Sequence, residues 1–537
     1  MPAPAAAQAE PEPRPGRRLA LNTAFFSFAT GLSRIAGLAR EVIAASYFGV
    51  TGAMSAFTIA FQVPALMRAL FADSALQGAF VPVFTELLEK GEKREAFRVA
   101  SGLFFLISLV LGAATALFFL VAPFVVPLFA PGFDEPLTDL TIKLSWILFP
   151  MVLLIALSGL VVGMLNSFEH FSAPALAPLA WNLVIVAFLV GLTPVLPKED
   201  EIYAYAFGVL VGTVVQLLLP MPWLRGRGGR FEVSFDFRNP HVTQVLKLML
   251  PVTIALGFIN FSQLINSLFA TLVQTEAPAA IDKAFRIYML PQGLFAVAVA
   301  TILFPTLSRF AARREYGDLR RTMANGVRQL CLLMIPSAVS IAVLAEPITR
   351  LVYERGVFDA EATDLVSEAM FWWAFSLPFQ GVSLLFSRTF FSIQRAWATT
   401  AVAVINLAVN ALVALVLYEP FGIAGIVIGT VVGTIVMTVS QGLILRGDLD
   451  GIEGGVILRA AALMVGASVP LALVAYGVQA VLDDALGRSL AGQAVAVGTA
   501  VAAGGAVYAA AVWALRIPEA RQIGRLLGGR FRRTRPS

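Results

Sequence analysis

Charged side chains are scarce in this chain. Only 14% of its 537 residues are Asp, Glu, Lys or Arg, whereas 58% are hydrophobic and the mean hydropathy is +0.81. A soluble domain of ordinary composition is about a quarter charged, so lipid rather than water must surround most of this protein. The formal charge of +5 is small, and the basic residues are scattered through loops. Both facts exclude the clustered basic face that nucleic-acid binding requires.

Residues suited to covalent chemistry are equally rare. The only cysteine, Cys331, cannot form an internal disulfide or a cysteine metal site. The only histidines, His170 and His241, fall in predicted loops and support neither a metal centre nor a catalytic triad. Walker, GxSxG, HExxH and CxxC patterns are missing, and an enzyme using Arg, Asp and Glu alone has no positive signal. We therefore expect no catalytic residues, metal or cofactor. Without an ATP site, any transport would be driven by Na⁺ or the membrane potential.

Uncharged apolar runs are what the sequence has in abundance. A membrane-spanning helix needs about 20 mainly apolar residues, and several runs are longer than this without a single charge: 99–133, 144–168, 396–418, 460–482 and 489–515. Because these runs do not alternate in polarity, they are helices rather than barrel strands. We predict an all-α integral membrane protein of about fourteen transmembrane helices, near residues 20–48, 53–86, 99–126, 139–166, 172–195, 202–224, 243–273, 279–312, 323–349, 362–392, 397–418, 421–445, 457–481 and 490–515.

The loops predict the orientation in the membrane. Basic residues in short loops mark the cytoplasmic side, and they gather in alternate loops, with Arg350 and Arg355 as exceptions. The basic positions include Lys90, Lys93, Arg94, Arg98, Arg225, Arg227, Arg309, Arg313, Arg314, Arg320, Arg321, Arg395 and Arg446. An even number of spans then places both termini in the cytoplasm. We expect residues 1–19 to be a disordered tail and residues 517–537 a basic tail that meets anionic lipid headgroups.

Two blocks of the chain resemble each other. Residues 165–185 are similar to residues 390–410, and Phe80-Val81-Pro82 is similar to Leu303-Phe304-Pro305 at nearly the same offset. Transporters are often built from two repeated lobes with the substrate site between them. We predict an N-lobe over 20–224, a cytoplasmic linker over 225–242, a C-lobe over 243–446 and two further C-terminal helices over 447–516. The two lobes are expected to surround a central cavity.

Several ionisable residues lie within the predicted membrane-spanning helices, where a charge is energetically unfavourable. An ionisable residue deep in a spanning helix costs about 2.5–3.5 kcal/mol on insertion scales and usually faces a cavity or a partner. Arginine suits phosphate because its planar fork donates two parallel hydrogen bonds. A cavity lined by these arginines would attract a pyrophosphate, although each could instead pair with a carboxylate or carbonyl or reach the interface. The arginines are Arg34, Arg40, Arg68 and Arg286, and the nearby carboxylates are Glu41 and Asp73.

Polar amides and hydroxyls form a second pattern. Asn406 and Asn410 share one helix face, as do Thr430 and Thr434. Asn266 belongs to a polar stripe with Asn260 and Gln263. Such groups serve either as interhelical hydrogen bonds or as a small cation site made of neutral oxygens.

Several stretches together resemble the MurJ/MviN family of lipid II flippases, in the multidrug/oligosaccharidyl-lipid/polysaccharide exporter superfamily. They are LSRIAGLAREVIAASYFG, FQVPALMRALFADSALQGAFVPVF, GMLNSFEHFSAPALAP followed by LAWNLVI, FRIYMLPQGLFAVAVATILFPTLSR and LVYERGVFD. The resemblance covers about residues 20–446. It implies a fourteen-helix fold with a V-shaped cavity, and a groove at the last two helices for the polyprenyl tail. It implies lipid II as the cargo, moved from the inner to the outer leaflet of the bacterial cytoplasmic membrane by alternating access.

The resemblance also assigns residues. It places substrate-binding arginines at Arg34, Arg40, Arg68 and Arg286, gating positions at Ser33, Glu41 and Asp73, and a sodium site at Asn266, Asn406, Asn410 and Thr430. Many relatives carry Asp at Ser55 and Asn at Ala65, which leaves the gate here with fewer partners. Relatives can also carry carboxylates at Asn266 and Asn410, so we expect sodium to bind weakly or not at all.

Other functions compete with lipid II transport. A flippase for another polyprenyl-pyrophosphate-linked glycan would use the arginines equally well. A cation-coupled drug exporter of the same superfamily would favour an acidic cavity, which this sequence lacks. A membrane scaffold for cell-wall synthesis enzymes would not need charges at membrane depth. Expected partners are lipid II, membrane lipids and cell-wall synthesis enzymes.

Overall fold

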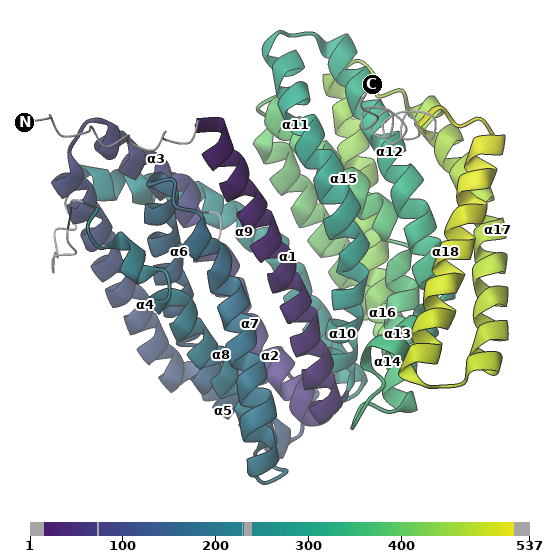
Figure 1. Ribbon diagram of the computed structural model, residues 1–537, viewed down its shortest axis with the longest axis horizontal. Coiled ribbons are helices and arrows are strands. Elements are labelled where there is room, and N and C mark those ends of the chain that lie inside the picture. The colour runs from purple at the N-terminus through teal and green to yellow at the C-terminus, as the bar shows by residue number, and fades with distance from the viewer. Residues whose placement is uncertain (1–14, 72–74, 228, 230–238, 520–537) are drawn as a thin grey trace, which may run out of the picture. The chain divides into compact units, whose positions relative to one another are not determined.

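The structure, a computed structural model, describes residues 15–71, 75–227, 229 and 239–519. Within these ranges every regular element is a helix, as the sequence predicts (Figure 1). The helices of the first half are α1 (Pro15–Phe48), α2 (Gly52–Phe71), α3 (Ala75–Glu89), α4 (Lys93–Phe129), α5 (Glu135–Leu148), α6 (Met151–Ser167), α7 (Ser172–Leu192), η1 (Thr193–Val195), α8 (Glu201–Leu218), η2 (Met221–Leu224) and α9 (Pro240–Val273). Those of the second half are α10 (Ala277–Pro291), η3 (Gln292–Ala296), α11 (Val297–Ala312), α12 (Tyr316–Val343), α13 (Ala345–Tyr353), α14 (Ala360–Ala374), α15 (Leu377–Ser392), α16 (Ala396–Asp448), α17 (Gly454–Leu486) and α18 (Leu490–Ala514).

The helices are long and apolar enough for a multi-pass membrane protein. Among the described residues, nine helices could each cross a bilayer, or ten if the bent pair α14 and α15 forms one span. This result is consistent with fourteen spans, because the 53 residues of α16 exceed one crossing. At about 1.5 Å per residue they would cover more than twice the hydrocarbon thickness of a bilayer.

The long helix α16 is interrupted near its middle. Gly422 has φ 54° and ψ −130°, a conformation that glycine adopts without steric cost. Beyond this break the halves pack closely, since a Cβ on Gly425 would lie 2.0 Å from the carbonyl oxygen of Leu417. The two spans predicted at 397–418 and 421–445 are therefore separate helical arms within α16.

Other predicted spans are broken once. Pro150 is the N-cap of α6 and separates it from α5, and α14 meets α15 at an angle of 50°. The predicted span 323–349 is divided into α12 and α13. After Pro291 the chain makes one π-helical turn, η3, before α11 begins. Proline has no N–H to donate, and it disturbs the helical ladder at such points.

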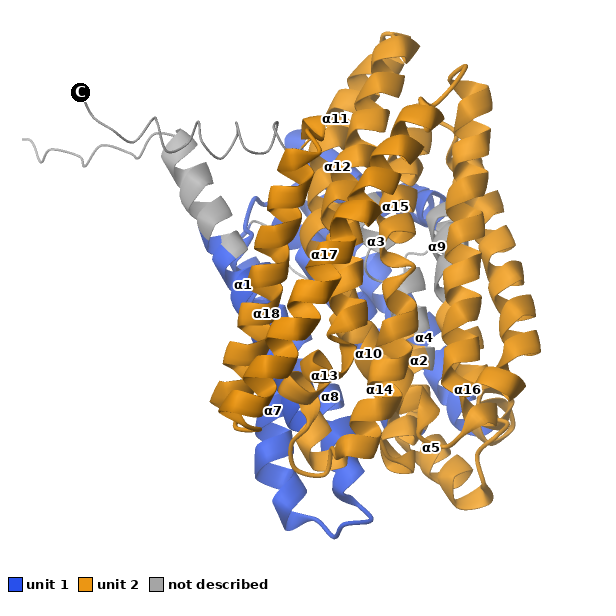
Figure 2. Ribbon diagram, turned by 90° about the vertical axis from the view of Figure 1, so that its right-hand side faces the viewer, with its two compact units in different colours: residues 1–44, 67–120, 146–253 blue, residues 45–66, 121–145, 254–537 orange. Residues whose placement is uncertain are grey.

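The chain forms two compact units, which Figure 2 colours separately. Unit 1 contains residues 1–44, 67–120 and 146–253, and unit 2 contains residues 45–66, 121–145 and 254–537. The core of unit 1 joins α3, α4 and α6 through packed aromatic rings, with Phe84 5.8 Å from Phe168 and 6.1 Å from Phe97 between ring centroids. In unit 2, α17 and α18 lie side by side and pack against α12 (Figures 1 and 2).

Candidate functional site

The polar site of unit 1 lies between α1 and α7. Arg40 and Glu41 are buried, and an Nη atom of Arg40 donates to an Oε atom of Glu41. The guanidinium carbon of Arg40 lies 4.6 Å from the centroid of the Trp181 ring, a cation–π distance. The Nε of Arg40 is buried without a hydrogen-bond partner among the residues that the structure describes. Arg40 is therefore oriented by a carboxylate on one side and a ring on the other, and keeps a free donor.

The neighbouring helix α7 fixes the backbone of α1 at this level. Asn182 donates its side-chain Nδ2 to the carbonyl of Ser33 at 3.3 Å and to that of Pro178 at 3.0 Å. Gly37 faces the same amide, because a Cβ there would lie 3.7 Å from it. Ser33, which was predicted as a gating residue, thus contacts α7 through its backbone.

Arg34 differs from Arg40 in its surroundings. It lies nearly two turns earlier on α1 and is exposed. No carboxylate pairs with it within the described ranges of the chain, so its donors remain available for a ligand.

In unit 2, Arg286 lies on α10. Its Nε is 2.8 Å from Oδ2 of Asp282, one helical turn earlier, and both side chains are partly exposed. The opposite side of α10 is fixed by aromatic packing, where Tyr288 stacks on Trp373 with 5.6 Å between ring centroids and exchanges a 2.6 Å hydrogen bond with Ser376. The helix is thus held rigidly while Arg286 faces away from the core.

Two predicted site residues lie outside what the structure describes. They are the side chain of Arg68, whose backbone belongs to α2, and the whole of Asp73. Arg34 and Arg40 belong to unit 1 and Arg286 to unit 2. The common cavity for these arginines stays a prediction.

The predicted cation site is a closed hydrogen-bond network in unit 2. The amide of Asn410 donates to Asn266 at 3.1 Å and to Ser262 at 2.8 Å, and the amide of Asn266 donates to Thr430 at 2.9 Å. Asn406 lies one turn from Asn410, and its Oδ1 is buried without a partner in the described part of the chain. The four predicted residues therefore gather neutral oxygens, but most of these already accept a hydrogen bond. Hard cations prefer oxygen ligands with negative charge among them, so the set fits sodium poorly.

An apolar groove runs along the C-terminal helices of unit 2. Its volume is about 600 Å³, within the usual range for ligand pockets. Most of its wall comes from α12 and α18, while α17 contributes one residue. Lining residues include Leu333, Pro336, Ile341, Leu471, Val501 and Tyr508. A groove of this composition suits a long hydrocarbon chain.

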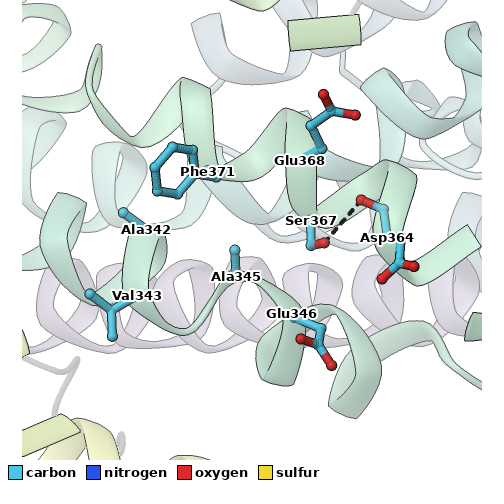
Figure 3. A pocket seen from close by; sticks show the side chains of 8 residues that line it. All are labelled: Ala342, Val343, Ala345, Glu346, Asp364, Ser367, Glu368 and Phe371. Carbon is cyan, nitrogen blue, oxygen red and sulfur yellow. Dashed lines mark hydrogen bonds between the residues drawn. The ribbon is translucent and has the colours of Figure 1, made fainter. Parts of the chain in front are cut away.

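A smaller cavity of about 290 Å³ lies between α12, α13 and α14, and Figure 3 shows its lining. The carboxylates of Glu346, Asp364 and Glu368 stand around it with the ring of Phe371. Ser367 donates to the carbonyl of Asp364 at 3.0 Å. Three carboxylates would repel a pyrophosphate, so this cavity is not a site for an anionic cargo.

Sequence reasoning missed several residues of these sites. Trp181 carries no signal in the sequence, because an aromatic residue in an apolar helix is typical of a core. Arg328 and Glu519, which pair in unit 2, were not singled out. An arginine one turn inside a predicted span is a signal that was present for Arg328.

The sequence matches one protein family and several of its named members. The sequence model of the family described as lipid II flippase MurJ matches residues 44–494. The chain is 32% identical over 404 residues to a probable lipid II flippase MurJ of Rhizobium meliloti, covering 74% of this chain and 75% of that protein. It is 33% identical over 351 residues to the lipid II flippase MurJ of Burkholderia cenocepacia, covering 64% and 67%.

Solved structures share the fold. A lipid II flippase MurJ in an inward closed conformation superposes with a TM-score of 0.73 at 23% identity, over 90% of this chain and 98% of that one. An inward-facing multidrug resistance transporter of the MATE family, in the MOP superfamily, gives a TM-score of 0.65 at 15% identity, over 80% and 95%. Both likenesses concern the fold. The sequence matches decide the family, and this chain belongs to the lipid II flippase MurJ family.

Proposed function

We propose that this protein moves lipid II, the polyprenyl-pyrophosphate-linked precursor of peptidoglycan, from the inner to the outer leaflet of the bacterial cytoplasmic membrane by alternating access. The observation that carries the proposal is the family match over residues 44–494, which includes parts of both units, all of α17 and the start of α18. Relatives that align with 74% and 83% of the chain are themselves named probable lipid II flippases.

The arginines support an anionic cargo. Arg34 is exposed and unpaired within the described ranges, and Arg40 keeps a buried Nε without a partner. A pyrophosphate offers several acceptor oxygens, and guanidinium groups bind such oxygens in pairs. Arg286 would add a third contact from unit 2, because its pairing with Asp282 is partly exposed and can be exchanged for a phosphate. Arg68 and Asp73 remain part of this proposal on sequence grounds.

The groove of α12, α17 and α18 supports a polyprenyl tail. Its lining is almost wholly apolar, and burial of hydrocarbon there removes it from headgroups and water. Headgroup and tail would thus bind to different parts of the chain, which suits a cargo with a charged end and a long apolar end.

Energy for transport would come from an ion gradient or the membrane potential rather than from covalent chemistry. The hydrogen-bonded network of Asn266, Asn410 and Thr430 makes the membrane potential the better candidate here than sodium. The charge pattern of the loops favours both termini in the cytoplasm. Membrane lipids, and cell-wall synthesis enzymes that use the cargo, would be its partners.

The test is complementation in cells depleted of their own flippase, combined with measurement of lipid II exposed on the outer leaflet. Arg34→Ala, Arg40→Ala and Arg286→Ala should abolish growth and lipid II exposure while the protein still inserts into the membrane. Arg321→Ala is a matched control, because Arg321 is exposed near the start of α12 and pairs with the nearby Asp318. Growth with all three variants would contradict the assignment of the arginines.

The same assay separates the competing functions. A flippase for another glycan would insert normally but expose no lipid II. A drug exporter would fail to complement and would instead lower the accumulation of a cationic dye. A scaffold would tolerate all three alanine variants.

A further inference from the structure

Two ion pairs stand at the two ends of the apolar groove. At one end, Nε of Arg328 lies 2.7 Å from Oε1 of Glu519, and the Glu519 side chain is only 2% exposed. Arg328 is one helical turn before Leu332, the first groove residue of α12, and Glu519 follows Trp513, the last groove residue of α18. The pair therefore lies just beyond the Leu332 end of the groove lining.

Arg350 on α13 lies beyond the other end, two residues after the lining residue Ile348. This arginine is buried and contacts two carboxylates, Oδ2 of Asp483 at 3.1 Å and Oε1 of Glu346 at 3.5 Å. Asp483 lies in the last turn of α17, so the contact ties α17 to α13. The lining residues from α12 and α13 lie between Arg328 and Arg350 in the sequence, and those of α18 lie between Asp483 and Glu519.

The backbone after α18 turns back to bring Glu519 into place. Arg516 has φ 54°, which is unusual for a residue other than glycine. The N–H of Ile517 reaches the carbonyl of Val512 at 3.2 Å, the six-to-one hydrogen bond of a Schellman motif. Ile517 is buried as well, so the short segment after the helix is held against α12. Spanning the membrane does not require this turn, because α18 already ends at Ala514.

These two ion pairs are expected to contribute little to the free energy of unfolding. Replacing a buried ion pair by apolar residues is often neutral or stabilising, since the lost hydration of both charges offsets their attraction. One carboxylate oxygen of each pair, Oε2 of Glu519 and Oδ1 of Asp483, is buried without a hydrogen bond to any described residue. Each carboxylate is thus held through a single oxygen rather than in a bidentate pair.

The two ends differ in how firmly they are held. Arg350 is shared between carboxylates on two helices, whereas Arg328 pairs with one carboxylate, carried beyond the C-terminal end of α18. We infer that Arg328 and Glu519 form a latch that sets the width of the groove at their end, and so position a long polyprenyl tail rather than a short one. The pair of Arg350 and Asp483 is the fixed end. This inference rests on the proposed function, in which the groove takes the tail.

The test uses the full-length protein in lipid nanodiscs and two fluorescent probes, undecaprenyl phosphate and farnesyl phosphate. Glu519→Gln opens the latch and should weaken binding of the long probe about fivefold or more, the lower range of coupling between linked sites, while binding of the short probe stays unchanged. The double variant Arg328→Glu with Glu519→Arg restores an ion pair of opposite sense and should recover the long-probe affinity. Arg395→Gln is the control, because it breaks the exposed pair with Asp448 away from the groove.

The outcomes separate the latch from the groove. Equal weakening of both probes, or no recovery in a folded double variant, overturns the latch and leaves a structural ion pair. If Glu519→Gln still prefers the long probe as the wild-type protein does, the latch is also overturned. The proposal that the groove binds the tail would then remain. If the wild-type protein binds both probes equally, the groove is not the site of the tail and the latch proposal fails. The complementation result for the arginines would still stand. Thermal unfolding of each variant, measured alongside, identifies any that fail to fold.

Discussion

Arg40 packs its guanidinium over the ring of Trp181, 4.6 Å from the ring centroid, while the adjacent Glu41 accepts its hydrogen bond. The ring and the carboxylate come from different helices, so the position of this charge depends on the packing of α7 against α1. Trp181 in turn donates its Nε1–H to Thr213 on α8 at 3.2 Å. A chain of contacts across three helices therefore orients one arginine.

Trp181→Leu should weaken both folding and transport. A desolvated cation–π contact contributes about 2 kcal/mol, so the variant should lose about 2–3 kcal/mol of unfolding free energy and part of its lipid II exposure. Trp181→Phe keeps a ring under Arg40 and should retain most of both. Thermal unfolding and the outer-leaflet assay measure the two effects. Wild-type behaviour of the leucine variant would show that the ring does not orient Arg40.

Gly433→Ala should destabilise the hairpin of α16. A Cβ at this position would lie 2.5 Å from Oδ1 and 3.0 Å from the carbonyl oxygen of Asn406, on the opposing arm. Overpacking of this kind costs about 1–3 kcal/mol. Gly466→Ala in α17 is the control, because a Cβ there would meet no other described side chain or helix within 4 Å, and a helical alanine gains about 0.5–1 kcal/mol over glycine. Equal unfolding temperatures for the two variants would contradict the close packing.

Acid should weaken unit 1 through His170, in the turn between α6 and α7. Burial, and then the positive charge of Arg227, lower the pKa of His170 below its ordinary value of 6.5. The unfolded chain therefore binds a proton at a higher pH than the folded chain, so stability is present above about pH 6.5 and falls as the pH drops below it. His170→Gln should reduce the loss of unfolding temperature between about pH 7.5 and pH 5.5. An identical loss in both proteins would assign the acid sensitivity to other groups.

Sodium should leave the wild-type protein unaffected. Replacing KCl by NaCl should not change its unfolding temperature, because the oxygens of Asn266 and Asn410 are neutral and mostly occupied by hydrogen bonds. Asn266→Asp supplies a carboxylate beside Thr430 and should introduce a stabilisation specific to sodium. A wild-type response to sodium of the same size would contradict the poor fit, whereas no response in Asn266→Asp would show that these four residues do not form a cation site.

Local patterns predicted much of this molecule. Apolar runs located the helices, and the break in α16 fell within a few residues of its predicted place because proline and glycine mark it at Pro420 and Gly422. Helical spacing also placed Asn406 on the same face as Asn410, one turn away. These relations depend on neighbours in the chain, which a sequence displays directly.

Contacts between residues far apart in the sequence could not be predicted from such local patterns. Arg40 meets Trp181, and Arg328 meets Glu519, only after helices distant in sequence have packed. The sequence places Glu519 at the start of a basic tail, and only the turn at Arg516 reveals its buried position. Likewise, the contact of Arg350 with Asp483 on α17 joins residues that are far apart in the sequence.

The π-helical turn after Pro291 changes how the helix that carries Arg286 must be read. One surplus residue in a helix shifts every later side chain by about 100° around the axis. A helical wheel drawn without interruption from α10 into α11 therefore assigns the side chains after Ala296 to the wrong face of the helix. Deleting one residue between Gln292 and Ala296 would restore an ordinary α-helical register and rotate α11 as a body, so alignments and mutational scans of this region need a one-residue phase correction.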